Sequence, residues 1–125
     1  SIPASLLAAN GDAVVFEAAG SFATSANNKR LRIKYGAAPL FDSGALAIAT
    51  AADWRAVGRI IRTGATTQKA IVEVSSASSL LVSTADYTTP TETLSGAVTL
   101  KATGEATDNN DVVQEFLSVA FAPTP

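Results

Sequence analysis

A strict alternation of apolar and basic side chains in residues 30–35 constrains the fold of this chain more than any other feature. The apolar members are Leu31, Ile33 and Tyr35, and the basic members are Arg30, Arg32 and Lys34. Successive side chains of a β-strand point to opposite faces of the sheet, so the pattern predicts a buried apolar row and a cationic row in water. Turn-forming residues flank the segment, with Asn27-Asn28 before it and Gly36 after it. The sequence therefore predicts a strand with one fixed register here.

The same period of two recurs along the chain and predicts an all-β fold. The other segments that we interpret as strands are residues 13–22, 37–42, 54–62, 68–75, 80–82, 97–103 and 112–121. Residues 45–57 also admit a helix, because they are rich in alanine and Thr50 with Asp53 resembles a helix cap, but the alternation from Trp54 onwards favours a strand. Residues 86–93 are interpreted as an extended loop. About eight short strands predict an antiparallel β-sandwich of jelly-roll type, with an immunoglobulin-like sandwich as the alternative.

Length and composition indicate one domain and narrow the range of functions. The 125 residues suit a single sandwich domain, with residues 1–12 as an extended lead-in and residues 122–125 as a proline-rich tail. The net charge of −2 argues against a general nucleic-acid binder, and no apolar run is long enough to cross a membrane. Histidine and cysteine are both absent, which removes Ser-His-Asp and Cys-His catalysis and ordinary zinc sites. We therefore expect a protein that is not an enzyme and needs no cofactor or metal.

The last predicted strand has apolar residues at both parities. Val113, Leu117, Val119 and Phe121 occupy one parity, whereas Val112, Phe116 and Ala120 occupy the other together with Gln114. A sandwich strand with one face in water needs apolar residues on one side only, so the pattern indicates cover on both sides. We interpret Val112, Gln114, Phe116 and Ala120 as a subunit interface. The alternative is a few apolar side chains exposed on an ordinary surface.

Basic and aromatic residues supply the candidate ligand contacts. Arg30, Arg32 and Lys34 could meet phosphate, an acidic glycan or an acidic partner. We favour a solvated strand face or a charged strand edge, because the net charge of the chain is negative. Trp54 and Tyr35 have inward parity and are expected in the core. Tyr87 lies in the predicted loop and stays a candidate contact for a sugar.

Acidic residues near the last strand form two further candidates. Asp108 and Asp111 lie in a polar turn with Asn109 and Asn110, where their oxygens could bind a hard cation such as calcium. Aspartate and asparagine are also the residues that a turn prefers, and the downstream glutamate of a calcium loop is missing. Glu115, in the last strand, is expected either to pair with an arginine or to lie in a subunit seam.

Several short runs resemble a known module. They are Ala8–Asp12, Phe41–Leu46, Ile61–Ala70, Asp86–Pro90 and Lys101–Ala106. With these runs, nearly the whole chain resembles a small β-sandwich module of structural proteins from tailed bacteriophages and prophages. The module occurs as a short virion protein or as the end of a longer fibre or tail protein, and its members usually have a further strand segment before the equivalent of Ile2-Pro3.

The resemblance implies a function, a location and partners. It implies a non-enzymatic virion protein that is made in the cytoplasm of the bacterial host and then sits on the particle surface as a capsid decoration, head fibre or tail-fibre tip. Its expected partners are two further copies in a homotrimer and other capsid or tail proteins, with neither nucleic acid nor membrane insertion. A tip domain that binds a host-surface glycan or another receptor is the alternative. The sequence leaves open the choice between head and tail, the host, and whether the chain is whole or part of a longer protein.

Overall fold

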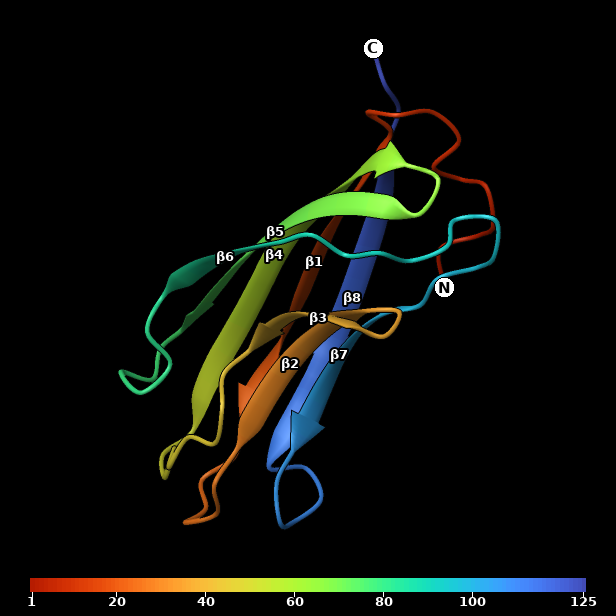
Figure 1. Cartoon of the computed structure of the whole chain (residues 1–125). Coiled ribbons are helices and arrows are strands. Elements are labelled where there is room, and N and C mark those ends of the chain that lie inside the picture. The colour runs from red at the N-terminus through yellow and green to blue at the C-terminus, as the bar shows by residue number, and fades with distance from the viewer.

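The computed structural model describes all 125 residues as a two-layer β-sandwich (Figure 1). Eight strands form a five-stranded sheet in the order β6-β5-β4-β1-β8 and a three-stranded sheet in the order β3-β2-β7, and every strand pair is antiparallel. The strands are β1 (Ala13–Phe22), β2 (Arg30–Tyr35), β3 (Ala38–Asp42), β4 (Ala52–Gly64), β5 (Thr67–Ser76), β6 (Thr84–Thr88), β7 (Leu100–Glu105) and β8 (Val112–Ala122). The predicted all-β sandwich of about eight strands is confirmed. No helix of the structure is long and apolar enough to cross a membrane.

The order of the strands in the large sheet specifies the type of sandwich further. Strands β4, β5 and β6 follow one another along the chain and are also neighbours in the sheet, which makes them a meander. A jelly roll is built from two Greek keys, which alternate between the sheets. The structure therefore shows a β-sandwich with a meander at one side, and the predicted jelly-roll type is not confirmed.

Alternating side chains from the two sheets meet in one apolar core of 22 buried residues. In β2, Leu31 and Ile33 are 1% exposed and Tyr35 is fully buried, so the predicted inward row is confirmed. Trp54 of β4 is also in the core, as expected from its parity. In β5 the inward residues Ala70, Val72 and Val74 alternate with exposed ones, which again matches the predicted register.

Three segments differ from the sequence-based prediction. Residues 80–82 lie in the connection between β5 and β6 and do not form a strand, although Leu81 is buried. The predicted loop at residues 86–93 begins inside β6. The predicted extended lead-in is extended only at Ile2, which pairs with Val98, whereas residues 4–11 form turns and bends.

Buried polar side chains close the two ends of the sandwich. Asp12 accepts hydrogen bonds from the Ala9 N–H (2.7 Å) and from the N–H and hydroxyl of Thr124 (2.9 Å each), and these contacts tie the first turn to the chain end. The two backbone N–H groups are the main cause of the lowered pKa of Asp12. At the other end, Lys29 is 1% exposed, and its ammonium group donates to the carbonyl oxygens of Ser25, Asn27 and Ile48 and to the Ser25 hydroxyl.

Candidate interaction surface

Strand β8 is the outer strand of the five-stranded sheet and pairs with β1 alone. It is 11 residues long and lies along one side of the sandwich (Figure 1). Of the backbone hydrogen bonds made by turns and loops, none reaches residues 112–122. The outer edge of β8 therefore presents a row of unpaired N–H and C=O groups to its surroundings.

A β-bulge interrupts the pairing of β8 with β1. Ala19 is opposite Phe116 and Gly20 is opposite Gln114, so Glu115 is the extra residue. The bulge forms where the strands come very close to the core tryptophan. A side-chain carbon added at Gly20 would lie 1.8 Å from the Val113 carbonyl oxygen and 2.7 Å from the Trp54 ring, so this position requires glycine.

The extra residue at the bulge shifts the alternation of faces along β8, so that even-numbered residues lie on one face before the bulge and on the other face after it. Directly opposed residues of an antiparallel pair share a face. Val112 is opposite the buried Phe22 and packs against the core, whereas Phe116 and Ala120 are opposite the outward-facing Ala19 and Val15. The prediction that Val112, Gln114, Phe116 and Ala120 share one face is therefore wrong, because the parity count assumed a regular strand. Val112 and Gln114 lie on the inner face, and Phe116 and Ala120 lie on the outer face.

Part of the inner face of β8 is not covered by the small sheet. This part lines an apolar groove. This groove has a volume of about 450 Å³. The N-terminal segment forms one wall with Ile2, Pro3 and Leu6, and the inner face of β8 forms the other wall with Leu117, Val119 and Phe121. Val119 and Phe121 are each 43% exposed, and Phe116 on the opposite face is 48% exposed. Apolar surface is thus open on both faces of this half of the strand.

The other three edge strands carry features that discourage further pairing. They are short, at five or six residues each. Strand β3 contains Pro39 and Asp42, β6 contains Asp86, and β7 contains Lys101 and Glu105. Charged residues and proline at a sheet edge oppose the addition of another strand. In β8 the run Phe116–Ala122 contains no charged residue, proline or glycine, so it is the unprotected edge of the sandwich.

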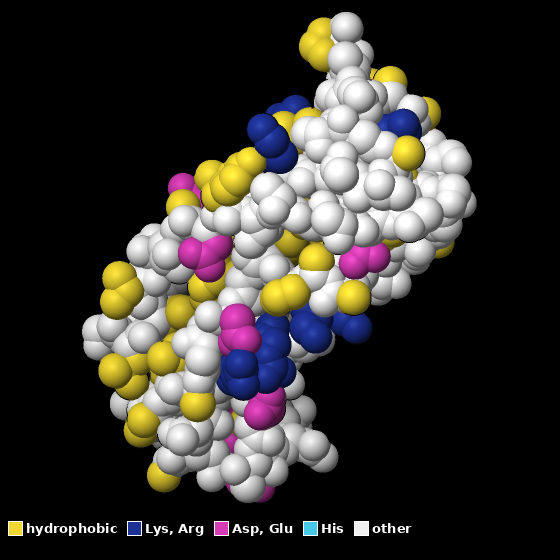
Figure 2. Space-filling model, in the orientation of Figure 1, with side chains coloured by type: hydrophobic (Ala, Val, Ile, Leu, Met, Phe, Trp, Pro, Cys, Tyr) yellow, Lys and Arg dark blue, Asp and Glu magenta, His cyan; other side chains and the backbone are white.

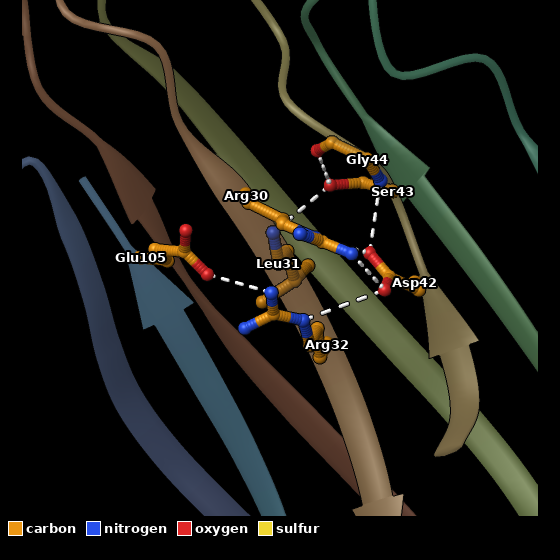
Figure 3. A network of polar contacts seen from close by, with 7 residues as sticks. All are labelled: Arg30, Leu31, Arg32, Asp42, Ser43, Gly44 and Glu105. Atoms are coloured by element: carbon orange, nitrogen blue, oxygen red, sulfur yellow. Dashed lines mark hydrogen bonds and ion pairs between the residues drawn. The ribbon is translucent and has the colours of Figure 1, made fainter.

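The predicted cationic row lies on the outer face of the small sheet, and two of its three members are paired with carboxylates (Figure 3). Arg30 donates two hydrogen bonds to Asp42, at 2.7 and 2.6 Å. Arg32 lies 3.4 Å from Asp42 and 2.6 Å from Glu105. The hydrogen bond from Arg30 is the main cause that holds the pKa of Asp42 well below its ordinary value.

The position of β2 in its sheet decides whether the basic row is a solvated strand face or a charged strand edge. Strand β2 is the middle strand of its sheet, so the charged-edge explanation is wrong and the row is an outward strand face. Figure 2 shows basic side chains gathered near the middle of this face with acidic ones beside them. Lys34 makes no ion pair and is directly opposite Lys101. As ligand contacts, Arg30 and Arg32 are therefore already occupied by partners within the chain.

Tyr87 is in β6 and not in a loop, but its side chain is accessible. It is 60% exposed on the outer face of the large sheet, where it is directly opposite Ile71, which is 48% exposed. Ile71 is in turn opposite Arg59 on β4. Three neighbouring strands thus place an aromatic, an aliphatic and a basic side chain in one row.

Asp108 and Asp111 share one hydrogen-bond donor, whereas Glu115 lies apart from them at the bulge. The side-chain amide of Asn27 donates to Asp108 and to Asp111, at 2.8 Å each, and its bond to Asp111 is the main cause of the lowered pKa of that buried carboxyl group. These two carboxylates therefore connect the β1–β2 and β7–β8 loops. Glu115 is exposed at the bulge and forms no ion pair, so the expected arginine partner within the chain is not observed. Its place in a subunit seam stays a prediction.

No protein-family model, curated protein or solved structure matches this chain. The resemblance to phage modules therefore rests on the sequence motifs alone. Two features of the surface were missed from the sequence, the bulge at Glu115 and the groove beside the N-terminal segment. The polar pair Gln114-Glu115 inside an otherwise apolar strand was the available signal for the bulge.

Proposed function

We propose that this chain is a non-enzymatic structural module on the surface of a bacteriophage particle, of the capsid-decoration or head-fibre type, which associates with copies of itself through β8. The observation that carries the proposal is the unprotected edge of β8, with its uncharged run Phe116–Ala122. The sequence motifs quoted above supply the phage context. The open edge of β8 and the sequence motifs together favour a protein that functions by assembling with other copies or proteins.

The exposed side chains of β8 offer a source of binding energy. Phe116, Val119 and Phe121 are each between 43% and 48% exposed. Covering the exposed half of one such side chain contributes roughly 1 kcal/mol. Backbone hydrogen bonds along the edge would also orient the contact, because they fix the distance and the chain direction of the added strand.

The use of the carboxylates also favours a structural role. Seven of the eleven acidic side chains accept hydrogen bonds or form ion pairs that join separate segments of the chain. Glu92 is an example, because it accepts hydrogen bonds from the N–H groups of Ala37 (2.7 Å) and Ala38 (3.3 Å) at the β2–β3 turn. In four of the seven, Asp12, Glu17, Asp42 and Asp111, hydrogen bonds lower the pKa of the carboxyl group and so favour its ionised form, whereas a catalytic acid needs a raised pKa.

Labelling of intact phage particles tests the proposed function. An antibody raised against the folded chain should decorate particles at regular positions in electron micrographs, and mass spectrometry of purified particles should detect the chain. Decoration of the head or of the tail fibre would distinguish the two locations. Particles that contain no copy of the chain would exclude a virion function.

A glycan-binding tip domain is the second candidate, and the row of Tyr87, Ile71 and Arg59 favours it. An exposed aromatic ring can stack on the apolar face of a sugar, and a nearby guanidinium can bond its hydroxyl or carboxylate groups. A glycan array of host-surface polysaccharides tests this candidate. Binding that is lost in Tyr87→Ala and kept in the control Val82→Ala, at a 72% exposed position, would support it.

A further inference from the structure

We propose that β8 pairs antiparallel with β8 of a second copy of this chain across a twofold axis at Val119, so that the two five-stranded sheets become one continuous sheet. This inference rests on the self-association in the proposed function and specifies its partner and contact. The occupant of the open edge is thus the same edge on another molecule.

Charge selects the second copy as the partner. The edges β3, β6 and β7 each carry at least one charged residue, so pairing β8 with any of them would place an ionised group against an apolar strand. Two β8 edges bring together only uncharged residues over the run Phe116–Ala122. An antiparallel contact between identical strands is also self-complementary, because every residue pair occurs twice.

The ends of the uncharged run fix the register. The run is bounded by Glu115 at the bulge and by Pro123, which has no N–H to donate. Directly opposed residues must share a face, so the register can move only in steps that keep inner residues opposite inner residues. With Val119 opposite its own copy, all seven residues from 116 to 122 find uncharged partners. If the twofold axis moved to Ser118, Glu115 would lie opposite Phe121. If it moved to Ala120, Pro123 would lie opposite Leu117.

This register covers the apolar surface on both faces. On the inner face, Val119 meets its own copy and Phe121 meets Leu117 of the second copy, so the two apolar grooves become continuous. On the outer face, Phe116 meets Ala122. A twofold contact closes with two molecules, and it therefore predicts pairs in place of the homotrimer that the resemblance implies.

A single engineered cysteine tests the contact directly, because the chain has no cysteine of its own. In Val119→Cys the two Cα atoms would be about 4.5–5.5 Å apart, which suits a disulfide. Phe116→Cys is the matched control on the same strand, since six residues of offset would separate its two copies by roughly 20 Å. Under mild oxidation we expect a cross-linked dimer from Val119→Cys at a yield at least about tenfold above that from Phe116→Cys and from the remote Val82→Cys.

Two solution measurements complete the test. Light scattering behind a sizing column, over a concentration series, should give a dimer for the native chain and a monomer for Val119→Lys. The Val119→Lys chain should still unfold in one cooperative thermal transition, because the side chain is 43% exposed. Its thermal midpoint should not depend on protein concentration, whereas the midpoint of the native dimer should rise with concentration. A monomer or trimer for the native chain, or equal cross-linking of the three cysteine variants, overturns the twofold β8 contact.

The outcome is separable from that of the proposed function. Labelled particles together with a failed Val119 cross-link would exclude this contact and leave the virion function in place. A specific Val119 cross-link together with unlabelled particles would exclude the virion function and leave the contact in place.

Discussion

Strands β2 and β8 have opposite arrangements of charge and of neighbours. Strand β2 has a partner strand on both sides, and all three of its outward residues are basic. Strand β8 has a partner on one side only, and after Glu115 it carries no charge at all. Charge is thus concentrated where the backbone is already paired and is missing where the backbone is open.

The comparison indicates that the charges of β2 do not protect an edge. They join the three strands of the small sheet, because Arg30 and Arg32 reach Asp42 on β3 and Arg32 also reaches Glu105 on β7. The edge strands of the small sheet carry their own charges and Pro39, so that sheet is closed to further pairing. Only the β8 side of the large sheet remains open to a further strand.

The largest expected effect comes from disturbing the attachment of β8 to β1. Gly20→Ala should lower the free energy of unfolding by about 3 kcal/mol or more, because the added carbon would meet the Val113 carbonyl oxygen and the Trp54 ring. Urea unfolding followed by tryptophan fluorescence measures this change. Gly96→Ala is the matched control, since its nearest neighbour would be 4.0 Å away, and it should change stability by less than about 0.5 kcal/mol. Equal stability of the two variants would contradict the close approach at the bulge.

The next largest effect tests the buried lysine just before β2. Lys29→Met should cost about 2–3 kcal/mol, because it leaves the carbonyl oxygens of Ser25, Asn27 and Ile48 without their donor. Thermal and urea unfolding measure the loss. Lys69→Met makes the same substitution at an exposed position of β5 and should be close to neutral. A loss at position 69 as large as that at position 29 would mean that charge, and not burial, sets the effect.

Much of the fold could be predicted from the sequence because period-two patterns record which face of a strand is buried. The register of β2 was readable since its inward residues are large and apolar and its outward residues are charged. Strand β4 could be predicted in part, because the alternation of apolar and polar residues from Trp54 onwards indicated a strand although the preceding residues resemble a helix start. Strand β6 was missed: it lies at an edge, and its residues are half-buried or exposed throughout, so no apolar row marks it.

The interaction surface could be predicted only in outline. Apolar residues at both parities of β8 made this strand a candidate interface, but a parity count cannot place a bulge. The bulge depends on how Gly20, Trp54 and Val113 meet, and these residues come from three different strands. Nor does a local pattern say which strands lie at an edge, because strand order is set by packing across the whole domain.

Removing the acidic partner of β2 should have a smaller effect. At neutral pH, Asp42→Asn should lower the free energy of unfolding by about 1 kcal/mol at most, since the ion pairs with Arg30 and Arg32 are partly exposed to solvent. The native pKa of Asp42 is below its ordinary value of 3.8, so the ionised carboxylate stabilises the fold. That contribution is complete above this value and is lost as the pH falls further towards the native pKa. The gap between Asp42→Asn and the native chain should therefore narrow in acid. Asp53→Asn, at an exposed position without an ion pair, is the control and should match the stability of the native chain at neutral pH.

The smallest effect at neutral pH concerns the inner face of the same strand. The hydroxyl of Tyr35 is buried without a hydrogen-bond partner, so Tyr35→Phe should change stability by less than about 1 kcal/mol at pH 7. Burial, assisted by the nearby charge of Glu92, raises the pKa of Tyr35 from 10.0 to about 12. The native state therefore favours the protonated phenol, and its stability is intact below pH 10.0 and declines as the pH rises towards about 12. Tyr35→Phe has no phenol to ionise there, so it should become the more stable chain in alkali, as measured by urea unfolding at a series of pH values. An alkaline decline as steep in Tyr35→Phe as in the native chain would assign that decline to other groups, and the inner face of β2 would then make no pH-dependent contribution.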